Sequence, residues 1–136
     1  RRHELEVLTS HRLGEPVDRL QPVLSGEQIL DLQEAVRHVE VDDSIHAYLL
    51  DIAESTRRSE DLFVGVSIRG ILALSRASQA AALLEGRTYV VPDDVKRLAV
   101  PVLSHRILTK GYLHGGQREA VEALVKRLVD EVPVPG

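Results

Sequence analysis

Two arginines on one apolar segment are the residues best suited to chemistry in this sequence. Arg69 and Arg76 lie seven positions apart, so on a helix they share one stripe, about 10 Å apart along the axis. Arg69 would stand in the first helical turn, directly after Gly65-Val66-Ser67. A guanidinium suits phosphate because its planar fork donates charge-assisted, often bidentate, hydrogen bonds. Composition alone favours the more ordinary interpretation, in which Arg69 extends into solvent or pairs with an acidic side chain.

A glycine-spaced segment, Gly111-x-x-x-x-Gly116-Gln117-Arg118, has the spacing of a phosphate-binding loop. Such a loop needs a lysine to reach the phosphates and a hydroxyl side chain to hold magnesium. Gln117 and Arg118 occupy those two positions, and no strand is predicted before them. The segment is therefore interpreted as an ordinary connector between helices.

Histidine, acidic and hydroxyl residues do not combine into a metal or catalytic site. No two of the 6 histidines have a recognised ligand spacing, and cysteine is absent. Asp42-Asp43 and Asp93-Asp94 precede helical patterns, where capping explains them. Ser10-His11 and Ser104-His105 are neighbours in sequence rather than a positioned nucleophile and base. The sequence predicts no metal site, no disulfide and no nucleophilic catalysis by these residues.

Helices must position the arginines, because the composition favours helix packing. Hydrophobic residues make up 43% of the 136 residues and aromatic residues only 3%, so Leu, Val, Ile and Ala must build the core. We predict an all-α helical bundle with one short extended segment near 88–91. No apolar run approaches the ~20 residues that a membrane-spanning helix needs.

Capping signals set the expected boundaries in the first half of the chain. Residues 1–13 are predicted to be helical, and 14–24 to form a connector in which Gly and Pro interrupt the periodicity. Ser25 and Gln28 form a capping box for a second helix. A third helix starts at the paired aspartates and is followed by a loop over 59–65.

The fourth predicted helix is the most apolar. Ser67 caps it, and Gly86 stops it just after residue 85. Because apolar residues cover nearly its whole circumference, we expect it at the centre of the bundle. A fifth helix begins with Pro92 at its first position, and Pro101 is expected to break or restart it. A last helix follows a loop over 111–116.

Four segments together resemble the lid domain of MoxR-type AAA+ ATPases. They are GVSIRG at 65–70, LALSRA at 72–77, GRTYVVPDDVK at 86–96 and PVLSHR at 101–106. Their order and spacing are specific, and the resemblance covers essentially the whole chain. It implies a helical lid domain of AAA+ type over 25–136, after a core-to-lid connector helix and loop over 1–24.

The resemblance also implies that the chemistry is shared with an ATPase core. That core would carry Walker A, Walker B, sensor 1 and the arginine finger, none of which this sequence contains. The chain is interpreted as an excised piece, not catalytic alone, of an enzyme that hydrolyses ATP with Mg²⁺. Arg69 matches the sensor 2 arginine, which reaches the γ-phosphate of ATP. Val66, Ser67 and Ile68 are expected near the adenine and ribose.

The implied partners are the chain's own ATPase core, neighbouring subunits of a ring that is often hexameric, and clients with von Willebrand A domains. The lid would couple ATP hydrolysis to chaperone-like remodelling, or to metal or cofactor insertion, in those clients. We expect a cytoplasmic location and no membrane insertion. The net charge of −4 argues against nucleic-acid binding. Ile68 and Gly70 depart from the Pro and Ala common in the family, which would loosen the helix start that holds Arg69.

Two other classes of function fit some of these features. A long central helix, a short extended segment and a Pro-Asp-Asp-Val helix also suit a non-enzymatic, histone-fold-like interaction module. The acidic balance and the lack of a basic cluster argue against DNA wrapping by such a fold. A free-standing adaptor that binds a partner helix in an apolar groove is the third possibility.

Overall fold

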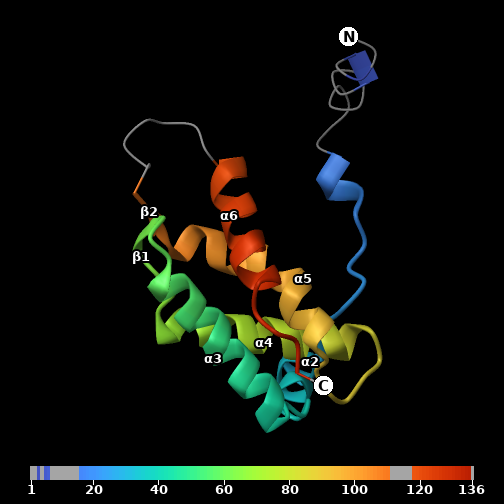
Figure 1. Cartoon of the computed structure of the whole chain (residues 1–136). Helices are drawn as coiled ribbons and strands as arrows, with labels where there is room; N and C mark the ends of the chain where they lie inside the picture. Colours follow the sequence, from blue (N-terminus) through green and yellow to red (C-terminus); the bar gives the residue numbers. More distant parts are fainter. Residues whose placement is uncertain (1–2, 4, 7–15, 111–117, 136) are drawn as a thin grey trace. The chain divides into compact units, whose positions relative to one another are not determined.

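The fold was analysed in a computed structural model, which describes residues 3, 5–6, 16–110 and 118–135. The predicted all-α class is confirmed: helices α2 to α6 carry the described chain, and a two-stranded sheet is the small addition (Figure 1). The chain divides into two compact units, Arg1–Leu32 and Gln33–Gly136. Within the described residues, no helix is long and apolar enough to cross a membrane.

The first unit contains the 3-10 turn η2 (Pro16–Arg19) and the beginning of α2 (Gly26–Arg37). The predicted capping box is confirmed, because the Ser25 amide donates to Gln28 Oε1 at 2.7 Å and the Gln28 amide donates to Ser25 Oγ at 3.1 Å. No residue of α2 is buried. Most of the helix predicted over 1–13 lies outside the described residues.

Four helices of the second unit surround one apolar core (Figure 1). They are α3 (Asp43–Arg58), α4 (Ile68–Leu84), α5 (Pro92–Leu103) and α6 (Arg118–Asp130). Helix α4 packs mainly on α5, and α3 and α6 cover the remaining sides of the core. The largest fully buried apolar side chains come from all four helices and the segment before α4: Tyr48, Leu49, Ile52, Val66, Leu74, Val95, Leu103 and Val125.

The predicted caps of α3 and α4 are confirmed. Asp42 Oδ1 accepts a hydrogen bond from the Ser44 amide at 2.8 Å, and Ser67 Oγ accepts one from the Gly70 amide at 3.3 Å. Gly86 ends α4 with a φ of 75°, a left-handed conformation that glycine adopts without steric cost. Two backbone hydrogen bonds, from Gly86 to the Leu83 carbonyl and from Arg87 to the Ala82 carbonyl, complete this stop.

The loop predicted over 59–65 is wrong in part, because it contains strand β1 (Leu62–Val64). This strand pairs antiparallel with β2 (Leu108–Thr109), with Leu62 opposite Thr109. Three residues are too few to show the alternation that predicts a strand. The partner strand lies far away in sequence, so only the packing of the helices brings the two together.

Helix α4 does not lie at the centre of the bundle, so that expectation is wrong. One side of it is buried through Ile71, Leu74 and Ala82. The other side leaves Ile68 and Leu72 57% and 53% exposed. An apolar circumference indicates burial on all sides only when neighbours exist on all sides. Among the residues that the structure describes, α4 has neighbours on one side.

The expected break at Pro101 is also wrong, because α5 continues through Pro101 to Leu103. A proline inside a helix removes one backbone hydrogen bond and crowds the carbonyl four residues earlier. Pro101 stands in the last turn of α5, so little helix remains to be disrupted after it. The 3-10 turn η3 (Ser104–Arg106) follows directly.

The segment predicted to be extended near 88–91 is confirmed as such. It forms a parallel bridge between Tyr89 and Glu40. The Glu40 amide donates to the Thr88 carbonyl at 2.8 Å, and the Val90 amide donates to the Glu40 carbonyl at 3.0 Å. The segment therefore links α4 to α5 and runs beside Glu40, just before α3 begins.

A buried carboxylate secures the start of α5. Asp94 has a side chain only 3% exposed, and Arg87 binds its two oxygens through two nitrogens, each at 2.8 Å. Asp94 also accepts from the Val91 amide at 3.0 Å, as the third helical residue of a capping box does toward the N-cap residue. Burial by itself raises the pKa of Asp94. The hydrogen bonds from Arg87 and Val91, together with the charges of Arg87 and Arg97, outweigh burial and lower this pKa.

We expect Asp94→Asn to reduce the free energy of unfolding by about 2–4 kcal/mol, because it removes the charge opposite the Arg87 guanidinium in a buried contact. Urea denaturation of the chain at pH 7 measures this change. Asp93→Asn is the matched control, since Asp93 occupies the same first turn of α5 but is exposed. Equal losses in the two variants would contradict a special role for Asp94.

The same contact predicts a dependence on pH. Because the pKa of Asp94 is lower in the folded chain, its stabilising effect is complete above the unfolded-state pKa of about 3.9. The effect is lost as the pH falls through the lower pKa of the folded state. The difference in unfolding free energy between the wild type and Asp94→Asn should therefore shrink below about pH 4. An unchanged difference at pH 3 would show that Asp94 is not the titrating group.

Candidate functional site

The first turn of α4 presents Arg69 to solvent. Ser67 is the N-cap, Ile68 is the first helical residue, and Arg69 follows it. Arg69 is exposed, and it makes no hydrogen bond or ion pair with any residue that the structure describes. The pairing with an acidic side chain that composition allowed is thus not present in this part of the chain. The guanidinium is free to meet a group from outside.

Val66, the residue before the N-cap Ser67, has both its main-chain amide and its main-chain carbonyl hydrogen-bonded. The Val66 amide donates to Thr56 Oγ1 at 3.0 Å, and the Val66 carbonyl accepts from Arg57 Nε at 2.9 Å. Thr56 Oγ1 in turn donates to the Ala53 carbonyl at 2.7 Å. Thr56 and Arg57 belong to the last turns of α3, so the end of one helix fixes the beginning of the next. We call these two residues and Val66 the α3–α4 clamp.

Two glycines allow the clamp to form. A Cβ atom on Gly65 would lie 2.8 Å from both Cα and N of Arg57, too close for any other residue. A Cβ atom on Gly70 would lie 2.8 Å from Cγ1 of the buried Val66, so an alanine there would displace Val66. Gly70 is expected to loosen the helix start, and nothing in its surroundings tests that expectation. Its position also lets the Val66 side chain pack against the backbone of α4.

The predicted site residues differ in accessibility. Ser67, Ile68 and Arg69 are exposed, whereas the Val66 side chain is only 1% exposed and belongs to the core. The clamp residues Thr56 and Arg57 were not predicted to hold the site. Their hydrogen bonds reach across a loop to a residue ten and nine positions away. Local periodicity carries no signal for such contacts.

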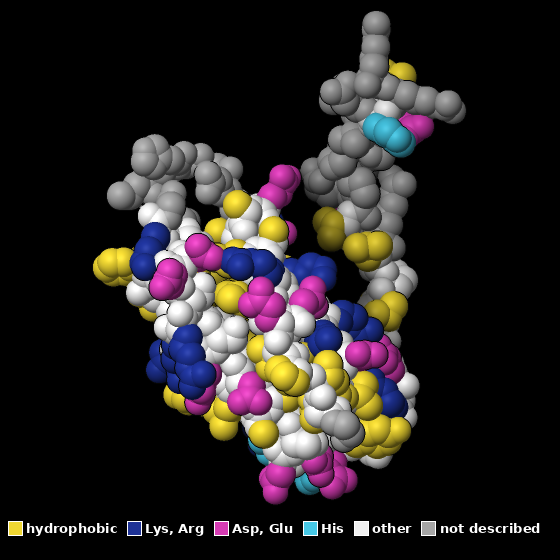
Figure 2. All heavy atoms as spheres, in the orientation of Figure 1, with side chains coloured by type: hydrophobic (Ala, Val, Ile, Leu, Met, Phe, Trp, Pro, Cys, Tyr) yellow, Lys and Arg dark blue, Asp and Glu magenta, His cyan; other side chains and the backbone are white. Residues whose placement is uncertain are grey.

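A second arginine lies beside the same turn. If Gly70 carried a Cβ atom, that atom would lie 3.4 Å from Cδ of Arg106. The aliphatic part of the Arg106 side chain therefore passes over the start of α4. Its Nη1 donates to the Val102 carbonyl at 2.7 Å and also contacts the His105 ring. Arg106 is therefore held by the end of α5 and η3. On the face drawn in Figure 2, Lys and Arg side chains are interspersed with Asp and Glu rather than gathered in one basic patch.

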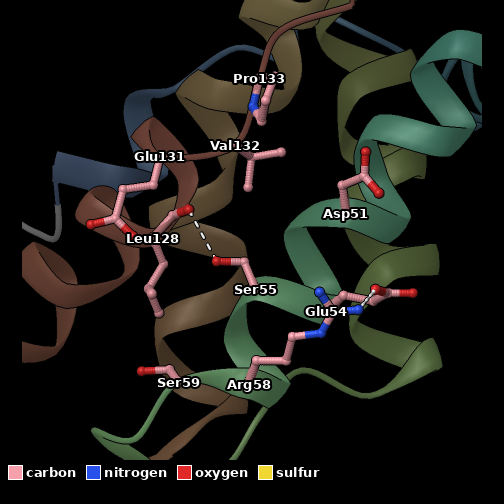
Figure 3. A pocket seen from close by; sticks show the side chains of 9 residues that line it. All are labelled: Asp51, Glu54, Ser55, Arg58, Ser59, Leu128, Glu131, Val132 and Pro133. Carbon is pink, nitrogen blue, oxygen red and sulfur yellow. Dashed lines mark hydrogen bonds and ion pairs between the residues drawn. The ribbon is translucent and has the colours of Figure 1, made fainter.

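An open groove of about 500 Å³ lies on another surface, between α3 and the chain that follows α6 (Figure 3). Its polar groups are largely engaged with one another. Arg58 pairs with Glu54 at 2.5 Å, and Ser55 Oγ donates to the Leu128 carbonyl at 3.3 Å. Asp51 and Glu131 add negative charge at its edges. The described residues that line the groove include no histidine or lysine beside these carboxylates.

Metal-ligating side chains do not gather at either surface within the part of the chain that the structure describes. No group of three or more His, Asp or Glu residues that could hold a metal ion occurs in the described ranges. The glycine-spaced segment 111–117 lies outside those ranges. The arrangement at the start of α4 can bind an anion through a cation, but it supplies no nucleophile, general base or metal ligand of its own.

Comparison with known proteins places the site in a family context. The AAA lid domain family matches residues 54–128, which include the clamp and Arg69. The chain is 40% identical over 134 residues to Uncharacterized protein YeaC of Bacillus subtilis, covering 97% of this chain and 41% of that protein. It is 29% identical to Protein MoxR of Methylorubrum extorquens, covering 91% of this chain and 40% of that protein.

Two further comparisons agree with these. Chaperone MoxR1 of Mycobacterium tuberculosis is 29% identical, with 92% of this chain and 35% of that protein covered. The fold also matches the crystal structure of a "putative ATPase" from Cytophaga hutchinsonii with a TM-score of 0.76, at 22% identity, covering 98% of this chain and 43% of that one. The chain therefore spans about two fifths or less of the length of the curated relatives named here.

The clamp can be tested without any ligand. Thr56→Val should lower the free energy of unfolding by about 1–3 kcal/mol, because it leaves the buried Val66 amide without an acceptor. Hydrogen exchange at the Val66 amide should become faster in the same variant. Thr56→Ser keeps the hydroxyl and is the matched control, with exchange at Val66 close to that of the wild type. Slow exchange in Thr56→Val would contradict the clamp.

Proposed function

The chain belongs to the AAA lid domain family, as a lid of the MoxR type, and we propose that it presents Arg69 to ATP bound in a separate ATPase core. The family match over 54–128 favours this function over a histone-fold-like interaction module or a free-standing adaptor. Arg69 is proposed as the sensor 2 residue, and residues 1–24 as the connector from the core to a lid over 25–136.

The observation that carries this proposal is the unpaired, exposed guanidinium at a fixed helix start. Arg69 has no partner within the described chain, while the turn that bears it is capped by Ser67 and held by the clamp. A cation that is already paired would have to break that pair before it could meet a phosphate. Arg69 has no such pair among the residues that the structure describes, so its charge is available to a nucleotide.

Arg69 would act on charge that develops during phosphoryl transfer. The transferred group spreads negative charge over its oxygens, and a positioned arginine stabilises that charge. The core would supply the remaining contacts to ATP and would hold Mg²⁺. Loss of the γ-phosphate removes the group that Arg69 binds, so hydrolysis would release the lid from the core.

Ser67 and Ile68 are proposed to lie near the ribose and adenine, because both are exposed beside Arg69. Val66 would contribute by setting the backbone there, since its side chain is buried. Ile68 and Leu72 continue an exposed apolar strip along α4. Contact with the chain's own ATPase core would bury this strip, as expected for a domain that does not act alone.

The remaining proposals extend from the lid to the whole ATPase. We propose that subunits form a ring, of the kind that is often hexameric in this family, in the cytoplasm. Lid movement would then drive chaperone-like remodelling, or metal or cofactor insertion, in clients with von Willebrand A domains. The name of one relative, Chaperone MoxR1, supports the chaperone part. The net charge of −4 supports a role without nucleic acid.

Arg69→Ala in the full-length ATPase should slow ATP hydrolysis about tenfold or more, since it removes one transition-state contact of at least ~1.4 kcal/mol. Steady-state turnover at saturating ATP measures this loss. Arg76→Ala is the matched control, because Arg76 is an exposed arginine of the same helix, two turns further along. Turnover that is unchanged in Arg69→Ala, or equally slowed in both variants, would reject the proposed role.

A further inference from the structure

We propose that Arg57 is a positioning residue that fixes Arg69 through the main chain of Val66, an inference that rests on the function proposed for Arg69. Arg57 lies in the last turn of α3 and would not touch the nucleotide. Its role would be to hold the segment from which α4 starts. The clamp would thereby set where the Arg69 guanidinium can reach.

The contacts of Arg57 differ from those of its neighbour Arg58. Arg58 pairs with Glu54 one turn earlier in α3, an ordinary exposed ion pair. Arg57 has no carboxylate partner among the residues described, and its one hydrogen bond there runs from Nε to the Val66 carbonyl at 2.9 Å. A guanidinium that donates to a main-chain carbonyl outside its own helix fixes a backbone position.

The geometry around this bond leaves little freedom. A Cβ atom on Gly65 would lie 2.8 Å from Cα and 2.9 Å from Cγ of Arg57, so the stem of Arg57 packs directly on the backbone of Gly65. Thr56 holds the Val66 amide while Arg57 holds the Val66 carbonyl. With both polar groups bound, the peptide planes on either side of Val66 cannot rotate without losing a hydrogen bond.

Apart from the Ser67 cap, the residues of the helix start give it little support of their own. Ile68 stands at the first helical position, where a proline would preset the backbone. Gly70 stands in the same turn and has more freedom to lose on folding than any other residue type. Arg69 lies between them, only three residues after Val66. Without Arg57, the first turn should open more often, and the guanidinium should sample a wider range of positions.

Misplacement of a catalytic contact affects turnover more than binding, because the contact to the γ-phosphate strengthens as charge develops. In the full-length ATPase, Arg57→Met should lower kcat about tenfold with little change in KM. Arg57→Lys should recover part of kcat, since its amine can still donate to the Val66 carbonyl. Arg58→Met, the matched control, should leave kcat unchanged.

Coupling to Arg69 separates positioning from an independent role. If Arg57 acts through Arg69, the double variant Arg57→Met/Arg69→Ala should be no slower than Arg69→Ala alone. Multiplied losses in the double variant would overturn the proposal, because Arg57 would then act without Arg69. Unchanged kcat in Arg57→Met, beside a slow Arg69→Ala, would overturn it as well and would leave the proposed function standing.

Normal turnover in Arg69→Ala would reject the proposed function. Hydrogen exchange tests the positioning role of Arg57 even in that case. In the full-length protein, Arg57→Met should speed exchange of the hydrogen-bonded amides of Val66, Gly70 and Ile71 about tenfold, and Arg58→Met should not. The Gly70 and Ile71 amides are informative, because Ser67 accepts hydrogen bonds from both. Exchange that is as slow in Arg57→Met as in the wild type would overturn the proposal, whatever the turnover.

Discussion

Two hydrogen bonds to the main chain of Val66 join the end of α3 to the beginning of α4. One is accepted by Thr56 and one is donated by Arg57, so a single residue is held from both sides. The close approach of Gly65 to Arg57 makes this junction possible. The junction holds the main chain immediately before α4, while α4 itself packs mainly on α5. A helix start is ordinarily the part of a helix most prone to fray, and here the neighbouring helix holds it.

Arg87 and Arg69 differ in whether they have a partner among the described residues. Arg87 binds the buried carboxylate of Asp94 with two nitrogens, and this contact orders the segment between α4 and α5. Arg69 has no such partner among the described residues. The first arrangement stabilises the domain because charge is matched inside it, and the second leaves charge for a group outside it. A structural and a proposed functional arginine thus differ by their surroundings rather than by residue type.

The exposed side of α4 connects the fold with the proposed function. Ile68 and Leu72 remain half exposed although the helix is among the most apolar segments of the chain. An isolated domain gains nothing from such residues in water, whereas a lid that closes on a core would bury them. The chain spans about two fifths of the length of YeaC of Bacillus subtilis and of MoxR of Methylorubrum extorquens.

The sequence by itself determined the helices, their caps and the family, because capping boxes, glycine stops and helical spacing act within a few residues. It also singled out Arg69 by its place in the first turn. It did not determine the strand at Leu62–Val64, the continuation of α5 through Pro101 or the exposed side of α4. Nor did it reveal that Thr56 and Arg57 hold Val66. The strand, the exposed side of α4 and the hydrogen bonds to Val66 depend on contacts between segments far apart along the chain. The continuation of α5 depends on how little helix follows Pro101. Only the packed structure decides these features.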